Sequence, residues 1–115
     1  MKAKQKCLAH LARTARDWQK VVPADSQSFA FFEAVKTLVT HGCRFHRTRT
    51  QRSADESAQE QGWIRAELER LVTCELDHDK GLTLQQRRVK HHDEWLVFLD
   101  NPAVPPTELL SADSL

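Results

Sequence analysis

Apolar residues recur at intervals of three and four along most of this chain, and that spacing limits what it can fold into. Between residues 7 and 22 they would line one face of a helix: Cys7, Leu8, Leu11, Ala15, Trp18 and Val22. The 115 residues include only 3 Gly, 4 Pro and no Tyr, which argues against a turn-rich β-sandwich. No segment alternates strictly enough to predict a strand. The pattern therefore predicts an all-α chain of about one domain.

Start and stop signals divide the chain into about four predicted helices. Their expected ranges are residues 3–22, 26–43, 53–79 and 83–100. Pro23 ends the first helix because the residue before a proline avoids the helical region. Ser26 or Asp25 can cap the second, since a side-chain oxygen there accepts a hydrogen bond from a free backbone amide. We interpret the polar, basic stretch that follows as a fraying helix end or a loop.

Two short polar patterns mark the expected starts of the third and fourth helices. Ser53 with Glu56, and Thr83 with Gln86, have the spacing of capping boxes, in which the two side chains satisfy each other's backbone amides. Gly81, between the two patterns, is a typical helix stop. We therefore expect a break in the helical structure immediately before Thr83.

The last fifteen residues differ in composition from the rest of the chain. Prolines at 102, 105 and 106 exclude a helix there, so we expect a helical domain over residues 1–100 and an extended, mobile Pro-rich tail over residues 101–115. The chain has no run of about eighteen apolar residues, which argues against a membrane span. Three widely spaced cysteines do not form a disulfide framework, and no apolar signal core follows the basic N-terminus. These features indicate a cytoplasmic protein.

Charge is distributed unevenly, although the formal net charge is only +1. The first 52 residues contain eleven Lys and Arg and three Asp and Glu, a formal charge of +8. The remaining residues contain six bases and thirteen acids, a formal charge of −7. Two interpretations fit this asymmetry: the basic half binds a polyanion, or the two halves attract each other within the fold.

The densest basic stretch lies between residues 44 and 52. Its arginines, Arg44, Arg47, Arg49 and Arg52, occur without any acidic residue among them. Guanidinium groups match the geometry of phosphate oxygens, so we predict that these four residues bind DNA. Such binding is salt-sensitive and largely independent of base sequence. The alternative is a solvated connector whose arginines pair with acids of the third helix.

A second candidate site consists of two Cys-x-x-His pairs, Cys7 with His10 and Cys43 with His46. Residues three apart share one face of a helix, so two adjacent helices could present four ligands to a tetrahedral zinc ion. The alternative is that both cysteines are small core residues. A zinc-stabilised helical interaction module is therefore the alternative to a nucleic-acid-binding function.

Two segments also resemble a known family. Residues 7–13, Cys-Leu-Ala-His-Leu-Ala-Arg, resemble a Cys-x-Ala-His-x-x-Arg segment of bacterial insertion-sequence transposases of the sixty-six family. Residues 88–107 resemble the stretch of that family that approaches the active site, a helix followed by Phe-Leu and a Pro-x-Val-Pro-x-Thr turn. The residues between the two segments have the length and character of the family's helical insertion.

The resemblance implies a fragment of a DDE transposase. Members of that family cut and join DNA with a ribonuclease-H-like domain, in which two Asp and one Glu hold two magnesium ions. This chain begins after the family's two Asp and departs from the pattern after Thr107, and Glu108 does not match the spacing of the catalytic Glu. The resemblance thus implies a truncated helical insertion with no catalysis and no resident cofactor of its own. The implied partners are DNA and a full-length transposase or a second copy, and not a membrane.

Overall fold

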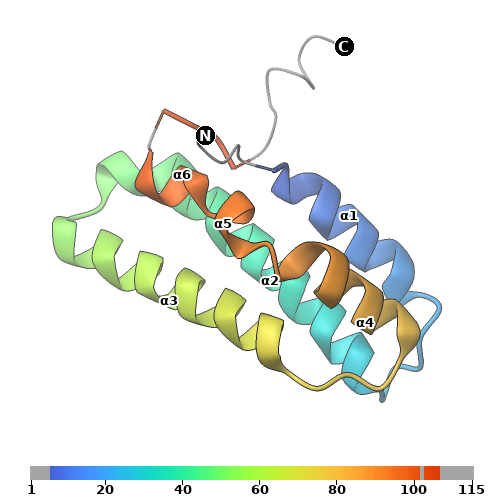
Figure 1. Ribbon diagram of the computed structural model, residues 1–115. Helices are drawn as coiled ribbons and strands as arrows, with labels where there is room; N and C mark the ends of the chain where they lie inside the picture. The colour runs from blue at the N-terminus through green and yellow to red at the C-terminus, as the bar shows by residue number, and fades with distance from the viewer. Residues whose placement is uncertain (1–5, 102, 107–115) are drawn as a thin grey trace, which may run out of the picture.

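The computed structural model describes residues 6–101 and 103–106, and every regular element within them is helical. In order, the elements are α1 (Leu8–Gln19), α2 (Gln27–Thr48), the 3-10 turn η1 (Arg49–Gln51), α3 (Ala54–Thr73), α4 (Asp79–Leu84), the π-helical turn η2 (Gln85–Val89), α5 (His92–Trp95) and α6 (Val97–Asp100). The all-α prediction is confirmed (Figure 1).

Helices α1 and α2 form an antiparallel pair, and α3 and α4 pack on the other side of α2 (Figure 1). At one end of the pair, the side-chain amide of Gln19 donates to the carbonyl of Phe29 at 3.2 Å. At the other end, Gly42 permits a close approach. A Cβ at that position would lie 3.3 Å from Leu8 Cδ1 and 3.2 Å from Phe98 Cζ, so the absent side chain is what lets α1 and α6 reach α2.

The hydrophobic core is centred on α2. Phe32, Val35 and Phe45 have no exposed surface, and burial of each such side chain stabilises the fold by about 1.5–3 kcal/mol. The other elements each contribute fully buried partners: Leu11 and Ala15 from α1, Ile64 and Leu68 from α3, Leu84 and Val89 from α4 and η2, and Phe98 from α6. Every long element therefore depends on α2 for its packing.

Two of the predicted caps are confirmed. The Ser26 hydroxyl accepts from the Phe29 amide at 3.0 Å at the start of α2. At the start of α3, the Ser53 hydroxyl accepts from the Glu56 amide at 3.1 Å, and the Glu56 carboxylate accepts from the Ser53 amide at 2.9 Å. This reciprocal pair is the predicted capping box.

The third helix is shorter than predicted, because it ends at Thr73 rather than near residue 79. One of the residues that follow it, Asp77, caps the N-terminus of α2. The Asp77 carboxylate accepts from the backbone amides of Gln27 and Ser28, both at 3.1 Å, at the free N-terminus of α2. Those bonds require the connection between α3 and α4 to leave the helix axis and run to the end of α2.

The fourth predicted helix, residues 83–100, is wrong in its start and in its continuity. Thr83 lies inside α4, whose start is capped by His78, where Nδ1 accepts from the Lys80 amide at 3.1 Å. After η2 the helix is interrupted before α5 and again before α6. The Trp95 indole donates to the Arg88 carbonyl at 2.8 Å, and this contact turns α5 back onto the end of η2.

The described part of the predicted tail is attached to the helices. Residues 103–106 form a turn and bends, and the Pro106 carbonyl accepts from the Leu8 amide at 2.9 Å. Residues 102 and 107–115 lie outside the described residues, so the mobile tail stays a prediction.

Gly81 generates a test of this packing. It lies in α4 against Ser28, and a Cβ there would be 2.9 Å from Ser28 Cβ. We expect Gly81→Ala to lower the free energy of unfolding by about 1–2 kcal/mol through overpacking, measured by urea denaturation followed by circular dichroism. Gly62→Ala is the matched control. Nothing lies within 4 Å of the added methyl group, so it should raise stability by up to about 1 kcal/mol. A Gly81 variant as stable as wild type would contradict the α2–α4 contact.

Asp77 generates a pH-dependent prediction. Hydrogen bonds from the amides of Gln27 and Ser28 keep the pKa of its carboxyl group below its ordinary value. The charged form therefore stabilises the fold at pH values above the ordinary carboxyl pKa, and this contribution disappears as the pH falls through the lowered pKa. We expect Asp77→Asn to lower Tm at neutral pH, by an amount that shrinks at acid pH. Glu75→Gln, an exposed neighbour, should show no such pH-dependent difference.

Candidate nucleic-acid interface

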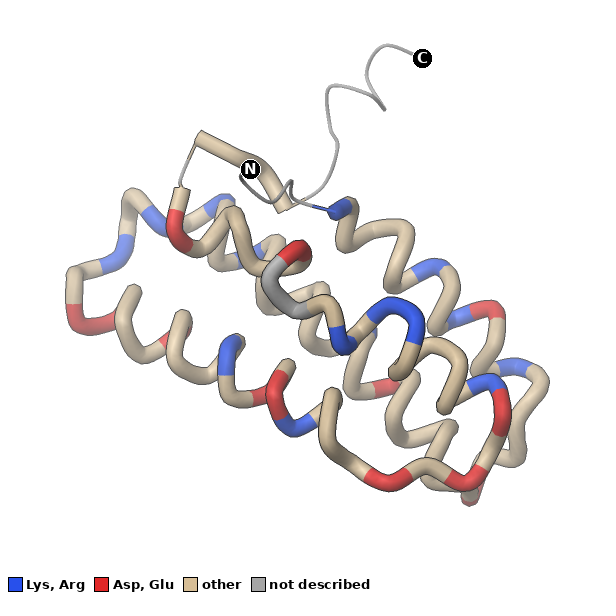
Figure 2. Tube along the Cα trace, in the orientation of Figure 1, with Lys and Arg blue, Asp and Glu red and all other residues tan. Residues whose placement is uncertain are grey.

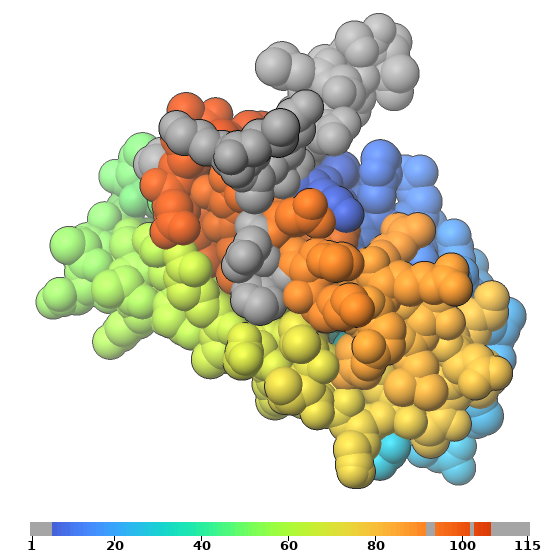
Figure 3. Space-filling view, in the orientation of Figure 1, coloured from blue at the N-terminus to red at the C-terminus, as the bar shows by residue number. Residues whose placement is uncertain are grey.

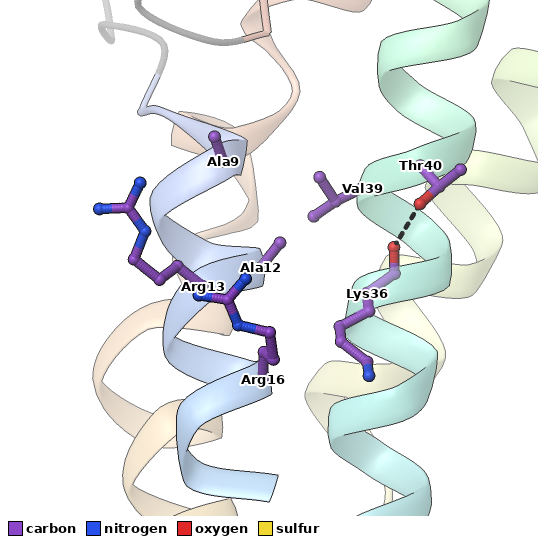
Figure 4. Close-up of a pocket in the computed structure, with 7 residues that line it drawn as sticks. All are labelled: Ala9, Ala12, Arg13, Arg16, Lys36, Val39 and Thr40. Carbon is purple, nitrogen blue, oxygen red and sulfur yellow. Dashed lines mark hydrogen bonds between the residues drawn. The ribbon is translucent and has the colours of Figure 1, made fainter.

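A groove of about 420 Å³ runs between α1 and α2 on the face turned away from α4 (Figure 4). Small and cationic side chains line it: Ala9, Ala12, Arg13, Arg16, Lys36, Val39 and Thr40. The α1 residues of the groove recur at steps of three and four, so they form a stripe beside the apolar face of that helix. The alanines leave the groove open because they have too little side chain to fill it.

The cations lie on both walls of the groove. Lys36 lies on the side of α2 that faces α1, Arg16 folds back over α1 towards Ala12, and Arg13 extends along the outer side of α1 (Figure 4). No carboxylate is among the lining residues. The arrangement suits an anion that contacts both helices at once.

Two acids next to the groove compensate part of its charge. Lys36 Nζ lies 3.1 Å from Glu33 Oε1, and Arg16 Nε lies 3.6 Å from Asp17 Oδ1. A hydrogen bond from Gln19 and the neighbouring Lys36 lower the pKa of Glu33. These pairs are largely exposed, and such pairs typically contribute about 0–1 kcal/mol. A phosphate group can therefore displace them at little cost, and Arg13 makes no ion pair with any described residue.

The basic surface continues along α2 beyond the groove. Arg44 and Arg47 follow Lys36 and Thr40 at steps of four and three residues, which places all four on neighbouring positions of one side of the helix. Both arginines are exposed, and within the described chain neither makes an ion pair. Basic residues lie along α1 and around the end of α2, and acids lie at the start of α3 and in the α3–α4 connection (Figure 2).

The two interpretations of the charge asymmetry can now be compared. Within residues 6–101 and 103–106, one Lys or Arg of the basic half forms an ion pair with the acidic half, Lys6 with Glu94 at 3.0 Å. The pair between Arg65 and Asp100 joins residues of the acidic half to each other. Most described Lys and Arg residues of the basic half therefore form no ion pair with acids of the other half.

The four arginines predicted to bind DNA occupy two different environments. Arg49 donates to the carbonyls of Phe98 at 2.7 Å and Leu99 at 3.0 Å, and its guanidinium lies 4.8 Å from the Phe45 ring centroid. Arg52 donates to the Thr48 hydroxyl at 3.0 Å and also lies over Phe45. Arg49 thus connects the end of α2 to α6, Arg52 packs back on α2 itself, and Arg44 and Arg47 face solvent.

The four predicted zinc ligands differ in burial. Cys7 is buried at the start of α1, whereas His10, one turn later, is exposed. Cys43 and His46 are half-buried. Burial raises the pKa of the Cys43 thiol and lowers that of the His46 imidazole, whose Nδ1 is buried and has no hydrogen-bond partner among the described residues. Among the described residues no three His, Cys, Asp or Glu side chains form a group that could hold a metal ion. The zinc site stays a prediction, without support from this geometry.

The groove itself was not among the sites predicted from the sequence. Arg13, Arg16 and Lys36 lie on two different helices and do not form a dense basic stretch in the sequence. Their signal was the helical spacing of Arg13 and Arg16 beside the apolar stripe of α1. This spacing indicates a groove only once α2 is known to lie beside α1.

Comparison with protein-family models, with curated proteins and with solved structures returns no match to this chain. The resemblance to insertion-sequence transposases therefore rests on the two sequence segments alone. In the described part of the chain, no helix combines the length and the apolar character needed to cross a bilayer.

The different environments of Arg49 and Arg44 generate a stability prediction. We expect Arg49→Ala to lower the free energy of unfolding by about 2 kcal/mol, because it leaves two carbonyls of α6 without their charged donor. Arg44→Ala, which removes the same side chain from an exposed position, should change it by less than about 0.5 kcal/mol. Urea denaturation of the two variants measures both effects. Equal stability of the two would show that Arg49 has no structural role.

Proposed function

We propose that this chain binds the phosphate backbone of duplex DNA through the basic face of the α1–α2 pair, as the helical part of a DDE transposase. The observation that carries the DNA-binding proposal is the groove with cations on both walls and its continuation along α2. Five residues make up the proposed surface, hereafter the groove surface: Arg13, Arg16, Lys36, Arg44 and Arg47.

The dimensions of the groove surface suit a nucleic-acid backbone. Lys36 and Arg47 are eleven residues apart on α2, which corresponds to about 16 Å along the helix axis. Counted over both strands, B-DNA carries one phosphate about every 1.7 Å along its axis, so a surface of this length can meet several phosphates. A single small anion could contact only the groove, whereas an extended polyanion can contact all five cations.

The absence of exposed aromatic side chains at the groove surface favours a duplex. Single-stranded nucleic acids are usually held by stacking of their bases on aromatic rings. In the described part of the chain, the exposed aromatic side chain is Trp63, and it lies on α3 with its ring centroid 4.4 Å from that of His41. Phosphate contacts without stacking or base contacts predict binding that depends on salt and hardly on sequence.

The path of the chain is compatible with the transposase part of the proposal. The Lys6 amide donates to the Glu94 carbonyl at 2.7 Å, and the Leu8 amide donates to the Pro106 carbonyl at 2.9 Å. The segments that precede α1 and follow α6 therefore lie side by side. A helical unit of this kind can be inserted into another domain without separating the two flanking strands of the host. The zinc-module alternative has less support, since His10 is exposed while Cys7 is buried.

A salt titration tests the DNA-binding proposal. If each of the five cations neutralises one phosphate, log affinity for a labelled duplex should fall against log salt with a slope of about −4.5. The triple variant Arg13→Ala, Arg16→Ala, Lys36→Ala should bind more weakly, with a slope shallower by up to about 2.7. Fluorescence anisotropy with limiting duplex measures both quantities.

A charge-matched control separates the groove surface from net charge. The variant Arg65→Ala, Arg70→Ala, Lys80→Ala also removes three positive charges, but from α3 and α4, and it should keep the wild-type slope. Equal loss in the two variants would reject the groove surface as the binding site. No binding of the wild-type protein at low salt would reject the DNA-binding function.

A further inference from the structure

A second basic surface lies on η2, and the groove surface does not include it. Gln86, Arg87 and Arg88 are exposed there, followed by exposed Lys90 and His91. Within the described chain, none of Arg87, Arg88 and Lys90 forms an ion pair, and no acidic residue occurs between residues 80 and 92. The three cations Arg87, Arg88 and Lys90 are hereafter the η2 surface.

The η2 surface is held by buried residues on both sides. Gln85 is 3% exposed, and its side-chain amide donates to the carbonyls of Leu71 at 2.8 Å and Cys74 at 2.7 Å, at the end of α3. Val89 has no exposed surface. The cations therefore project from a segment whose backbone is fixed between two anchors. Such π-helical turns are rare, and they are frequent at functional sites.

Stabilisation of a helix end does not account for these cations. Basic residues near a C-terminus often interact with carbonyls that lack a partner. Here the Gln85 carbonyl accepts from the Lys90 amide at 3.0 Å, and the Arg88 carbonyl accepts from the His91 amide at 3.0 Å and the Trp95 indole at 2.8 Å. Backbone amides and an indole, rather than the basic side chains, thus satisfy the carbonyls of Gln85 and Arg88.

The groove surface and the η2 surface face opposite sides of the molecule. In Figure 1, α4 lies in front of α2, and Figure 3 shows the same segment forming part of the outer surface between α3 and α1. In Figure 4, which looks into the groove, the segment that contains α4 lies behind α1. A single straight polyanion on one surface therefore does not reach the other.

We propose that the η2 surface binds the phosphate backbone of a second DNA duplex, so that one molecule bridges two duplexes. The groove surface holds the first duplex, and in that respect the inference rests on the proposed function. The exposed side chains of η2 are all polar or charged. An acidic protein partner would usually bury an apolar core in its interface, whereas a phosphate backbone needs only charged donors.

Capture of one duplex by another tests the bridge. An immobilised duplex is loaded with the protein, washed, and then offered a fluorescent duplex of the same length. Wild type should retain the second duplex. The variant Arg87→Ala, Arg88→Ala, Lys90→Ala should load on the first duplex as wild type does, but retain roughly tenfold less of the second because it lacks three phosphate contacts. Circular dichroism checks that both proteins are equally helical.

A conservative variant distinguishes charge from side-chain loss. Arg87→Lys with Arg88→Lys keeps both positive charges, so it should retain the second duplex almost as wild type does. Loss of capture in this variant would contradict a phosphate-backbone contact. Undiminished capture by the triple alanine variant would overturn the η2 surface. Sedimentation of that variant would then show whether self-association forms the bridge.

The two proposals fail in different ways. A wild-type protein that loads on the first duplex but captures no second one overturns only the bridge. The groove variant Arg13→Ala, Arg16→Ala, Lys36→Ala should still bind a duplex weakly through the η2 surface. If this variant bound a duplex with wild-type affinity, the result would contradict the groove surface and not the bridge. Binding of polyglutamate, but of no duplex, by the groove variant would assign the η2 surface to an acidic protein and overturn the proposal.

Discussion

The packing of α2 is the constraint on which the rest of the structure depends. Its 22 residues contact α1 on one side and α3 and α4 on another, and Phe32, Val35 and Phe45 have no exposed surface. A helix buried on these sides has only a narrow stripe left for solvent. Arg44 and Arg47 occupy that stripe, and Lys36 borders it at the groove. The position of the candidate interface is thus a consequence of what the core has already covered.

The same packing places the arginines of a single basic segment in two different environments. Arg44 and Arg47 still belong to α2 and face outward, but α2 ends at Thr48, and Arg49 lies in η1, where the chain turns towards α3 and passes beside α6. Its guanidinium supplies donors to two carbonyls that the short α6 leaves free, and it lies over Phe45. Arg44 thus belongs to the proposed DNA-binding surface, whereas Arg49, five positions later, is predicted to stabilise the fold.

Local signals predicted the local structure well. The Ser26 cap and the Ser53 capping box depend on residues within three positions of each other, and both are present. Prediction failed where a long-range contact competes with local preference. Asp77 bonds to the start of α2, some fifty residues earlier, so α3 ends before residue 79. Thr83 has the spacing of a cap, but the helix has already started at Asp79, where it packs beside α2.

The sequence by itself determined an all-helical chain, its long helices and its excess of positive charge before residue 53. Helical spacing and capping are properties of neighbouring residues, so they can be read without a fold. Only the tertiary structure brought Arg13, Arg16 and Lys36 together, and only it placed the η2 surface on the opposite side. It also separated Cys7 from His10 by burying one and exposing the other. A binding surface is made by residues from different helices, and their relative positions depend on which apolar faces meet in the core.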